Sequence, residues 1–322
     1  FFKKHKINSS TMNVILICGS GSIALRHFSN LKKLGYHEII FFSKNKNLLK
    51  DVNKPIYKNL DEALSLKPKI AFICNNTSDH IKTSIKCAKA NCHLFIEKPI
   101  SNNLKNISIL KKLLHKNKLV SHVGYMMRYH PLLIKLKKII DKKRYGKLSY
   151  LRSIWGEDLK LWHPYEDYKR SYAGKKKLGG GPLITLSHDF DTIMWLFGDF
   201  KKIATNKNKS SFLKIDTDHL VDILIKLTDG ATGSINLNYI QNPPKRIFEL
   251  TFTKGYIEYD YYKNSLSLFQ KGKLVKKYIN KKFDKNTMFI KEIKYFLNKV
   301  KNNNFDLDMI NSSEKLLKII LK

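Results

Sequence analysis

The sequence predicts an α/β fold in two parts: an N-terminal Rossmann domain with a doubly wound parallel sheet, and a C-terminal α+β domain with a mostly antiparallel open sheet. Three observations support this prediction. The first third alternates strand-length apolar runs with amphipathic, helix-length stretches. A glycine-rich turn, GSGSIA, follows the first apolar run and opens the first helical stretch. From about residue 148 onward, strand-like segments follow one another without helices between them.

The first βαβ unit lies over residues 14–43. Val14–Cys18 is a continuous apolar run, as expected of a strand covered on both faces. The next stretch carries apolar residues at helical spacing and ends at Gly35, a usual helix stop. Residues 37–43, HEIIFFS, form the second predicted strand.

Further strands are predicted over residues 69–75, 92–97 and 119–125, and further helices over 78–90 and 104–118. Either Ser78 or Asp79 is expected to cap the first of these helices. Repeated βαβ units imply a parallel sheet with right-handed crossovers.

The C-terminal part begins with the predicted strand LSYLRSIWG at residues 148–156. Five more strands are expected over residues 219–227, 232–240, 246–253, 255–262 and 265–272, with turns at the DG and NPP sequences. Residues 287–304 and 312–322 are predicted to be amphipathic packing helices. The free face of the open sheet would suit self-association, so we expect a homodimer or homotetramer.

The chain has 322 residues, of which 43% are hydrophobic, enough for two domains. We expect an N-terminal extension over residues 1–11, a dinucleotide-binding domain over 12–121, and a substrate-binding and oligomerisation domain over 122–322. Met12 is interpreted as the natural start. The basic N-terminus lacks the apolar core of a signal peptide, and no apolar run reaches membrane-spanning length, so we expect a cytoplasmic protein.

The formal net charge of +35 suggests a nucleic-acid binder, but the composition argues against it. Only six of the 61 basic residues are arginine, the residue most used to read bases and phosphates. The lysines are spread along the whole chain, as expected of solvated surface positions. We therefore predict no nucleic-acid and no membrane partner, and a field that would steer anionic small molecules.

The four cysteines, Cys18, Cys74, Cys87 and Cys92, lie in or beside apolar segments. They contain no C-x-x-C spacing, so the sequence predicts no metal site. We interpret them as buried free thiols.

The glycine turn predicts a dinucleotide site. Gly19 permits the tight turn, Gly21 lets the backbone approach a pyrophosphate, and Ala24 lets the helix pack on the strand. The pyrophosphate would meet the free N–H groups at the helix N-terminus. The predicted cofactor-binding residues are Gly19, Ser20, Gly21, Ser22, Ile23, Ser43, Lys44, Asn75, Thr77, His80, Glu97 and Lys98.

The end of the second strand bears on which dinucleotide binds. An NAD site usually carries Asp or Glu there, to bind the ribose 2′-hydroxyl. Here Ser43 is neutral and Lys44 is basic, which suits a 2′-phosphate. The sequence favours NADP and leaves NAD open, because Lys44 is also explained as one more solvated lysine.

Three stretches, in order, resemble the Gfo/Idh/MocA oxidoreductase family, which includes glucose–fructose oxidoreductase and inositol dehydrogenase. They are GSGSIA, the EKP sequence at residues 97–99, and GGGPLITLSHDFD at residues 179–191. VGYMMRYHP, at 123–131, resembles the segment that joins the family's two domains. The resemblance implies an NAD(P)-dependent oxidoreductase that transfers a hydride between a nicotinamide cofactor and a hydroxyl or keto group of a sugar or sugar derivative.

The resemblance also implies that Lys98 lies at the nicotinamide and the substrate hydroxyl, where it assists proton transfer. A lysine of ordinary pKa is a poor base at neutral pH, but burial would lower its pKa. A cis peptide bond before Pro99 would fix where Lys98 points.

His188 is the second predicted catalytic residue. Asp191 lies three residues later on the same face of a predicted helix, where it would orient the imidazole or cap locally. Many family members carry an aspartate one turn before this histidine, whereas here Ile184 or Thr185 occupies that region. The proton relay therefore stays open between His188 with Lys98 alone and a contribution from Asp189.

The segment over residues 152–181 is dense in aromatic and charged residues, as expected of a site that stacks a sugar ring and binds its hydroxyls. The predicted substrate-binding residues are Tyr125, Arg128, Trp162, His163, Tyr168 and Asp191. Arg128 or Arg170 would meet a carboxylate or phosphate. The arrangement is similar to family members of bacterial surface-sugar pathways. The alternative function is a dinucleotide-binding regulator without catalysis.

Overall fold

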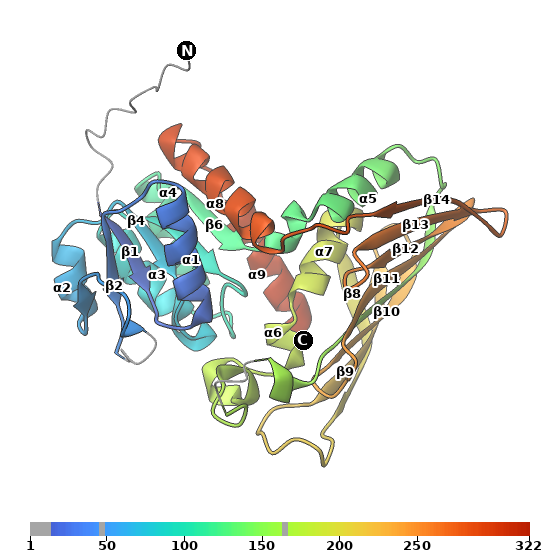
Figure 1. Cartoon of the computed structure of the whole chain (residues 1–322), viewed down its shortest axis with the longest axis horizontal. Helices are drawn as coiled ribbons and strands as arrows, with labels where there is room; N and C mark the ends of the chain where they lie inside the picture. Colours follow the sequence, from blue (N-terminus) through green and yellow to red (C-terminus); the bar gives the residue numbers. More distant parts are fainter. Residues whose placement is uncertain (1–13, 45–48, 163–166) are drawn as a thin grey trace.

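The computed structural model describes residues 14–44, 49–162 and 167–322, so the expected extension over residues 1–11 lies outside the described part. The chain forms two sheets with helices around them (Figure 1). One sheet has six strands and the other has eight. This arrangement confirms the predicted fold class, a Rossmann part followed by an α+β part.

The six-stranded sheet has the order β3-β2-β1-β4-β5-β6, and all its strand pairs are parallel. The two central strands, β1 and β4, are apolar and buried at every position, because helices cover both faces of the sheet. The strands are β1 (Ile15–Cys18), β2 (Ile39–Phe42), β3 (Ile56–Tyr57), β4 (Ile70–Ile73), β5 (His93–Glu97) and β6 (Ser121–Gly124).

Alternate residues of these strands face two helical layers. α1 (Ser22–Lys33) and α8 (Asn286–Lys301) share a core with one set, which includes Ile15, Ile17 and Phe72. α2 (Leu60–Ser65), α3 (His80–Lys89) and α4 (Ile107–Lys116) contribute to the core of the other set. The C-terminal helix α8 therefore returns to the first sheet, beside α1 (Figure 1).

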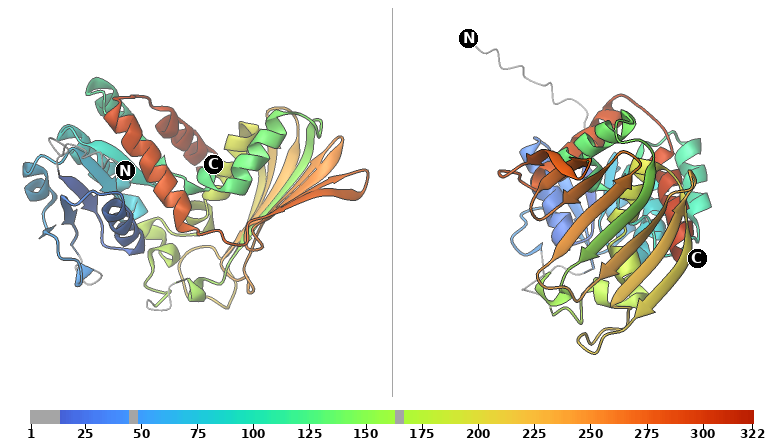
Figure 2. Two further views of the ribbon diagram at one scale, coloured as in Figure 1. Left: turned by 45° about the horizontal axis from the view of Figure 1, so that its top comes forward. Right: turned by 90° about the vertical axis from the view of Figure 1, so that its right-hand side faces the viewer.

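The eight-stranded sheet has the order β14-β13-β12-β11-β7-β10-β9-β8. Within the described residues, β7 and β10 pair in parallel and the other neighbouring strands of this sheet pair antiparallel. Its strands are β7 (Leu148–Gly156), β8 (Phe200–Asn208), β9 (Leu220–Leu227), β10 (Thr232–Asn238), β11 (Lys245–Phe252), β12 (Gly255–Asp260), β13 (Ser265–Gln270) and β14 (Lys273–Ile279). One face packs on helices and the other is open, as the right-hand view of Figure 2 shows.

The helices behind this sheet include α5 (Pro131–Asp141), the short α6 (Pro182–Thr185), α7 (His188–Phe197) and α9 (Asp308–Leu321). Because these helices cover one face of the sheet and the other face is open, residues along β9 alternate strictly between buried and exposed after its first position. Within the described residues, none of the helices is both long and apolar enough to cross a membrane.

Several elements were not predicted. β8 and β14 occupy the two edges of the large sheet, and their lysine-rich sequences show no clear apolar alternation, because most of their residues are exposed. α5 was also missed, although Pro131 at its first turn and its apolar stripe are helix signals. Asp79 is the N-cap residue of α3, one of the two predicted alternatives, but its side chain makes no capping hydrogen bond, and a 3₁₀ turn over Thr77–Asp79 leads into the helix.

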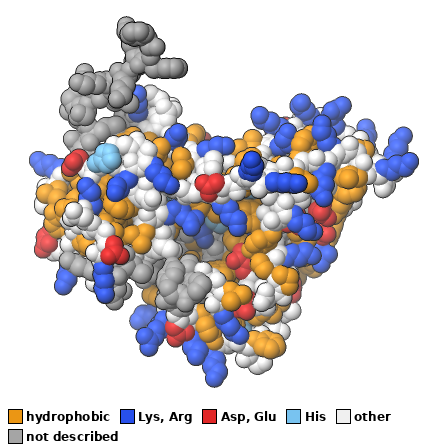
Figure 3. Space-filling view, viewed as in Figure 1, with side chains coloured by type: hydrophobic (Ala, Val, Ile, Leu, Met, Phe, Trp, Pro, Cys, Tyr) orange, Lys and Arg blue, Asp and Glu red, His pale blue; other side chains and the backbone are white. Residues whose placement is uncertain are grey.

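The charge distribution agrees with the sequence analysis. On the face shown in Figure 3, lysine and arginine side chains are scattered over both lobes and do not gather in one stripe. The four cysteines are buried and free, as predicted.

Candidate functional site

A groove of about 1190 Å³ lies at the carboxyl ends of the parallel strands, where open α/β sheets bind ligands. Both parts of the chain line it: the loops after β1, β2, β4 and β5 on one side, and the segments after β7 and before α7 on the other. This volume exceeds that of a usual small-molecule site, so it has room for a dinucleotide and a second molecule.

All twelve predicted cofactor-binding residues line this groove. Gly19 has φ +136°, and a Cβ on it would meet the carbonyl oxygen of Cys74 at 2.5 Å, so only glycine fits. A Cβ on Gly21 would meet nothing within 4 Å, so the backbone there is open to the groove. The first turn of α1 has no acidic residue and no side-chain cap, which leaves its N–H groups free for an anion. The turn therefore fits a pyrophosphate.

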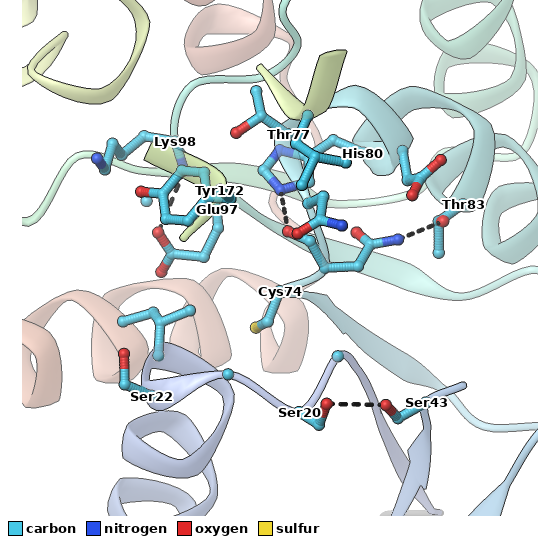
Figure 4. A pocket seen from close by; sticks show the side chains of 18 of the residues that line it. Ser20, Ser22, Ser43, Cys74, Thr77, His80, Thr83, Glu97, Lys98 and Tyr172 are labelled. Carbon is cyan, nitrogen blue, oxygen red and sulfur yellow. Dashed lines mark hydrogen bonds between the residues drawn. The ribbon is translucent and has the colours of Figure 1, made fainter. Parts of the chain in front are cut away.

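The end of β2 carries no carboxylate. Ser43 donates a hydrogen bond from its hydroxyl to that of Ser20 at 2.9 Å (Figure 4). Lys44 is exposed at the groove wall, where Lys58 and Lys82 also lie. Lys44 and Lys58, which follow the paired strands β2 and β3, thus give this end of the groove positive charge.

His80 contacts the loops that follow two neighbouring strands, β4 and β5. Its Nδ1 lies 2.9 Å from the Pro99 carbonyl oxygen and its Nε2 lies 3.0 Å from that of Asn75. The ring is buried, and desolvation lowers its pKa. Both ring nitrogens already face backbone carbonyls, so His80 is placed to position the loops after β4 and β5.

Lys98 follows β5 and is part-buried at the junction of the two parts (Figure 4). Its Nζ donates to the backbone carbonyl oxygen of Thr185 at 2.7 Å. Desolvation lowers its pKa to about 8, Glu97 opposes this shift, and Arg246 adds to it. The Lys98–Pro99 peptide bond is cis, as considered from the sequence. An amine with this pKa can accept a proton near neutral pH.

Glu97 is anchored from α1, a contact that the sequence analysis missed. Its Oε1 lies 2.7 Å from Nε2 of His27, and its Oε2 accepts a hydrogen bond from the backbone N–H of Lys98 at 3.2 Å. His27 is fully buried. A histidine on the buried face of the helix that follows the glycine turn was the available signal.

His188 begins α7 and lines the groove opposite the glycine turn. Its ring lies edge-on to Tyr125, with centroids 5.7 Å apart, and 6.0 Å from the ring of Trp155. Among the described residues, its Nδ1 has no hydrogen-bond partner. Desolvation, Lys98 and Arg246 together lower its pKa well below the ordinary value, so the imidazole is neutral at neutral pH.

The two aspartates of α7 have partners other than His188. Asp191 accepts two hydrogen bonds from Arg128, at 2.6 and 2.9 Å, so the prediction that it orients His188 is wrong. Asp189 is fully buried and binds Arg246 and Ser153, which excludes it from the open proton relay. Thr185 occupies the region of the missing carboxylate, and its carbonyl oxygen holds the lysine instead.

The structure divides the predicted substrate residues. Trp162 lines the groove, and His163 lies outside the described residues. Tyr125, Arg128, Tyr168 and Asp191 are not among the described lining residues, and the Arg128 charge is already paired with Asp191. The described lining of the groove therefore does not support direct substrate contact through these four residues. The groove is lined here by Trp155, Glu157, Trp162, Arg170, Tyr172 and Leu186, and Glu157 was not predicted.

No metal site emerges from the part of the chain that the structure describes, where no three His, Cys, Asp or Glu residues are grouped to hold an ion.

Comparisons with known proteins agree with this geometry. Residues 14–125 match the family model described as "Oxidoreductase family, NAD-binding Rossmann fold", and residues 133–258 match the "GFO/IDH/MocA C-terminal domain". The chain is 26% identical to myo-inositol 2-dehydrogenase of Thermotoga maritima, over 57% of this chain and 54% of that protein. It is 28% identical to scyllo-inositol 2-dehydrogenase (NAD(+)) of Bacillus subtilis, over 39% of this chain and 34% of that protein.

The matched region thus spans about half the length of the first of these relatives and about a third of the second. A solved structure of levoglucosan dehydrogenase in complex with NADH has the same fold, with a TM-score of 0.84 at 16% identity, covering 96% of this chain and 95% of that one.

Proposed function

The chain belongs to the Gfo/Idh/MocA family of oxidoreductases, and from this premise we propose that it transfers a hydride between NADP(H) or NAD(H) and a hydroxyl or keto group of a sugar or polyol. One observation carries the proposal. The amine of Lys98, with a pKa of about 8, lines the same groove as the glycine turn that fits a pyrophosphate.

A bound nicotinamide supplies the hydride acceptor for alcohol oxidation and the hydride donor for the reverse reaction. The chain itself handles the proton. The neutral Nζ of Lys98 accepts the proton of the substrate hydroxyl while the Thr185 carbonyl fixes the direction of the amine. His188 is neutral and its ring lines the same groove, where the imidazole would hydrogen-bond the substrate oxygen. Tyr125 and Trp155 pack on the imidazole and hold its ring in place.

The function is tested by mixing the purified chain with NADP⁺ or NAD⁺ and a panel of polyols, and following cofactor absorbance from pH 6 to 10. We expect oxidation rates to rise through about pH 8 and then level off, because oxidation needs the neutral amine of Lys98. The reverse reduction needs the ammonium form, so its rate should fall as the pH rises through the same value.

Cofactor binding with no oxidation or reduction anywhere on the panel would instead favour a regulator without catalysis. The replacement of the family's aspartate region by Thr185 supports that second candidate. A pH profile flat between 7 and 9 would contradict the role of Lys98 as the proton acceptor.

We propose NADP as the preferred dinucleotide, because Lys44, Lys58 and Lys82 line the groove near the end of β2 and Ser43 stands where an NAD site carries an acid. In fluorescence titrations, wild type should bind NADPH more tightly than NADH. Lys44→Ala should weaken NADPH binding about two- to fivefold at low salt and leave NADH nearly unchanged, since an exposed charge pair contributes about 1 kcal/mol or less.

Lys89→Ala is the matched control, because Lys89 is also exposed on the same domain but does not line the groove. Equal weakening of NADPH and NADH by Lys44→Ala, or tighter binding of NADH by wild type, would contradict the preference.

We also propose that the protein self-associates through the open face of the eight-stranded sheet. That face exposes Tyr150 and Leu224, which are 41% and 52% accessible.

A further inference from the structure

Glu157 is a carboxylate in the substrate part of the groove that the proposed reaction does not use. It follows directly after β7, the strand paired with both β10 and β11 near the middle of the large sheet. Its backbone N–H donates to the Asn238 carbonyl oxygen at 3.1 Å. The side chain is half-buried and lines the groove together with Trp155 and Trp162. A rigid strand end therefore presents this carboxylate.

Among the residues that the structure describes, one oxygen of Glu157 is engaged by the protein. Oε1 accepts a hydrogen bond from the indole Nε1–H of Trp155 at 2.7 Å and another from the Tyr262 hydroxyl at 2.6 Å. Within the described part of the chain, Oε2 has no hydrogen-bond partner. Two donors on the same oxygen hold the carboxylate in one orientation, and they leave the second oxygen as an unused charged acceptor.

The hydrogen bond from Trp155 connects Glu157 to His188, one of the proposed proton-handling residues, because the His188 ring lies near the Trp155 ring. The Trp155 ring lies against two residues: the Arg246 guanidinium is 3.7 Å from its centroid, and the His188 ring is 6.0 Å away. Trp155 thus contacts both residues: the His188 imidazole lies near its ring, and the Glu157 carboxylate accepts a hydrogen bond from its indole N–H. A molecule whose hydroxyl meets His188 and Lys98 would lie within the same part of the groove as Glu157.

We propose that Glu157 is a specificity-determining residue that selects an uncharged polyol, by accepting a hydrogen bond from a second hydroxyl of the substrate ring on Oε2. This inference rests on the proposed function and deepens it by naming the substrate class. A carboxylate accepts hydroxyl hydrogens strongly and repels a substrate carboxylate or phosphate brought to the same place. The tryptophans beside it supply apolar surface for the C–H face of a ring.

Arg170 is the feature that opposes this assignment. It lines the same groove and would attract an anionic substrate. Its side chain is exposed, however, so solvent and salt screen its charge more than that of the half-buried Glu157. The test therefore has to compare neutral and anionic sugars directly.

Glu157→Gln removes the negative charge and the free acceptor oxygen while it keeps the size of the side chain. The amide keeps one oxygen to accept from Trp155 and Tyr262, and it replaces the free acceptor by an NH₂ donor. With saturating cofactor, kcat/KM should fall about ten- to a hundredfold for myo-inositol and glucose, the loss expected for a charge-assisted hydrogen bond. Glucuronate and glucose 6-phosphate, poorer substrates of the wild type, should be equal or better with the variant. The affinity for NADPH should not change.

Glu38→Gln is the matched control. Glu38 is exposed at the start of β2, on the edge of the sheet opposite the groove, so this variant should behave as wild type. Tryptophan fluorescence of the cofactor complex, read during sugar titration, gives binding without turnover, because Trp155 and Trp162 line the groove.

The outcomes separate the two proposals. Wild-type oxidation of neutral polyols with Glu157→Gln unchanged would overturn the role of Glu157 and leave the proposed function standing. A wild-type preference for glucuronate or glucose 6-phosphate, or a preference for glucosamine over glucose that Glu157→Gln abolishes, would overturn the uncharged-polyol assignment. A protein that binds NADPH but neither binds nor converts any sugar would overturn both.

Discussion

Lys98→Met should lower kcat about 10²- to 10⁴-fold, the usual contribution of a positioned general acid or base. Methionine has a similar length and is apolar, so the part-buried site can hold it, but it has no group to accept the hydroxyl proton. The affinity for the dinucleotide should change little, because the glycine turn and the N-terminus of α1 remain. The measurements are steady-state rates at pH 8.5 and a fluorescence titration with NADPH.

Two further variants show which property of Lys98 matters. Lys98→Arg keeps the positive charge, but its guanidinium does not release a proton in this pH range, so it should be nearly as inactive as the methionine variant. Lys112→Met changes an exposed lysine on α4 outside the groove and should retain full activity. Wild-type turnover by Lys98→Met would reject the proposed chemistry, and activity retained by Lys98→Arg would assign the lysine an electrostatic role only.

Arg246→Met should destabilise the fold by about 3–5 kcal/mol, the cost of leaving one buried charge without its partner. Arg246 is 2% exposed on β11, donates to Asp189 at 2.6 and 3.0 Å, and packs on the Trp155 ring. Without it, the side-chain donor that remains to the Asp189 carboxylate among the described residues is the Ser153 hydroxyl, at 2.8 Å. The expected result is a clear shift of the urea midpoint with an unchanged slope.

Arg152→Met provides the comparison on the same sheet. Arg152 is exposed on β7 and lies 3.5 Å from Glu249, so its loss should cost about 1 kcal/mol or less. The double variant Arg246→Met with Asp189→Asn should recover part of the lost stability, since it removes the unpaired charge. If Arg246→Met were no more destabilising than Arg152→Met, the buried ion pair would not be what holds α7 on the sheet.

Much of the dinucleotide half of the site was predictable because its determinants are local. The glycine turn, the residues that end β2 and the EKP sequence each lie within a few positions of a strand end. In a parallel sheet the carboxyl ends of neighbouring strands meet at one edge, so predicting the strands also placed these residues together.

The substrate half was predicted less well because its geometry depends on contacts between distant segments. Arg128 and Asp191 were expected to meet a ligand but neutralise each other, 63 positions apart. Glu157 was overlooked because part of its orientation comes from Tyr262, which lies 105 positions later in the sequence. The edge strands β8 and β14 were missed because most of their residues are exposed to water, so their sequences are largely polar and show no clear apolar alternation.

By itself the sequence determined the family resemblance, the parallel arrangement of the strands in the first sheet, and the choice of Lys98 as the candidate catalytic residue. Short motifs and apolar periodicity are properties of consecutive residues, so they can be read without the fold. Only the tertiary structure decided what surrounds that amine. The carbonyl of Thr185 holds it across 87 positions, and His27 anchors its neighbour Glu97 across 70. A hydrogen bond needs its two atoms about 3 Å apart, and folding alone brings such distant residues that close.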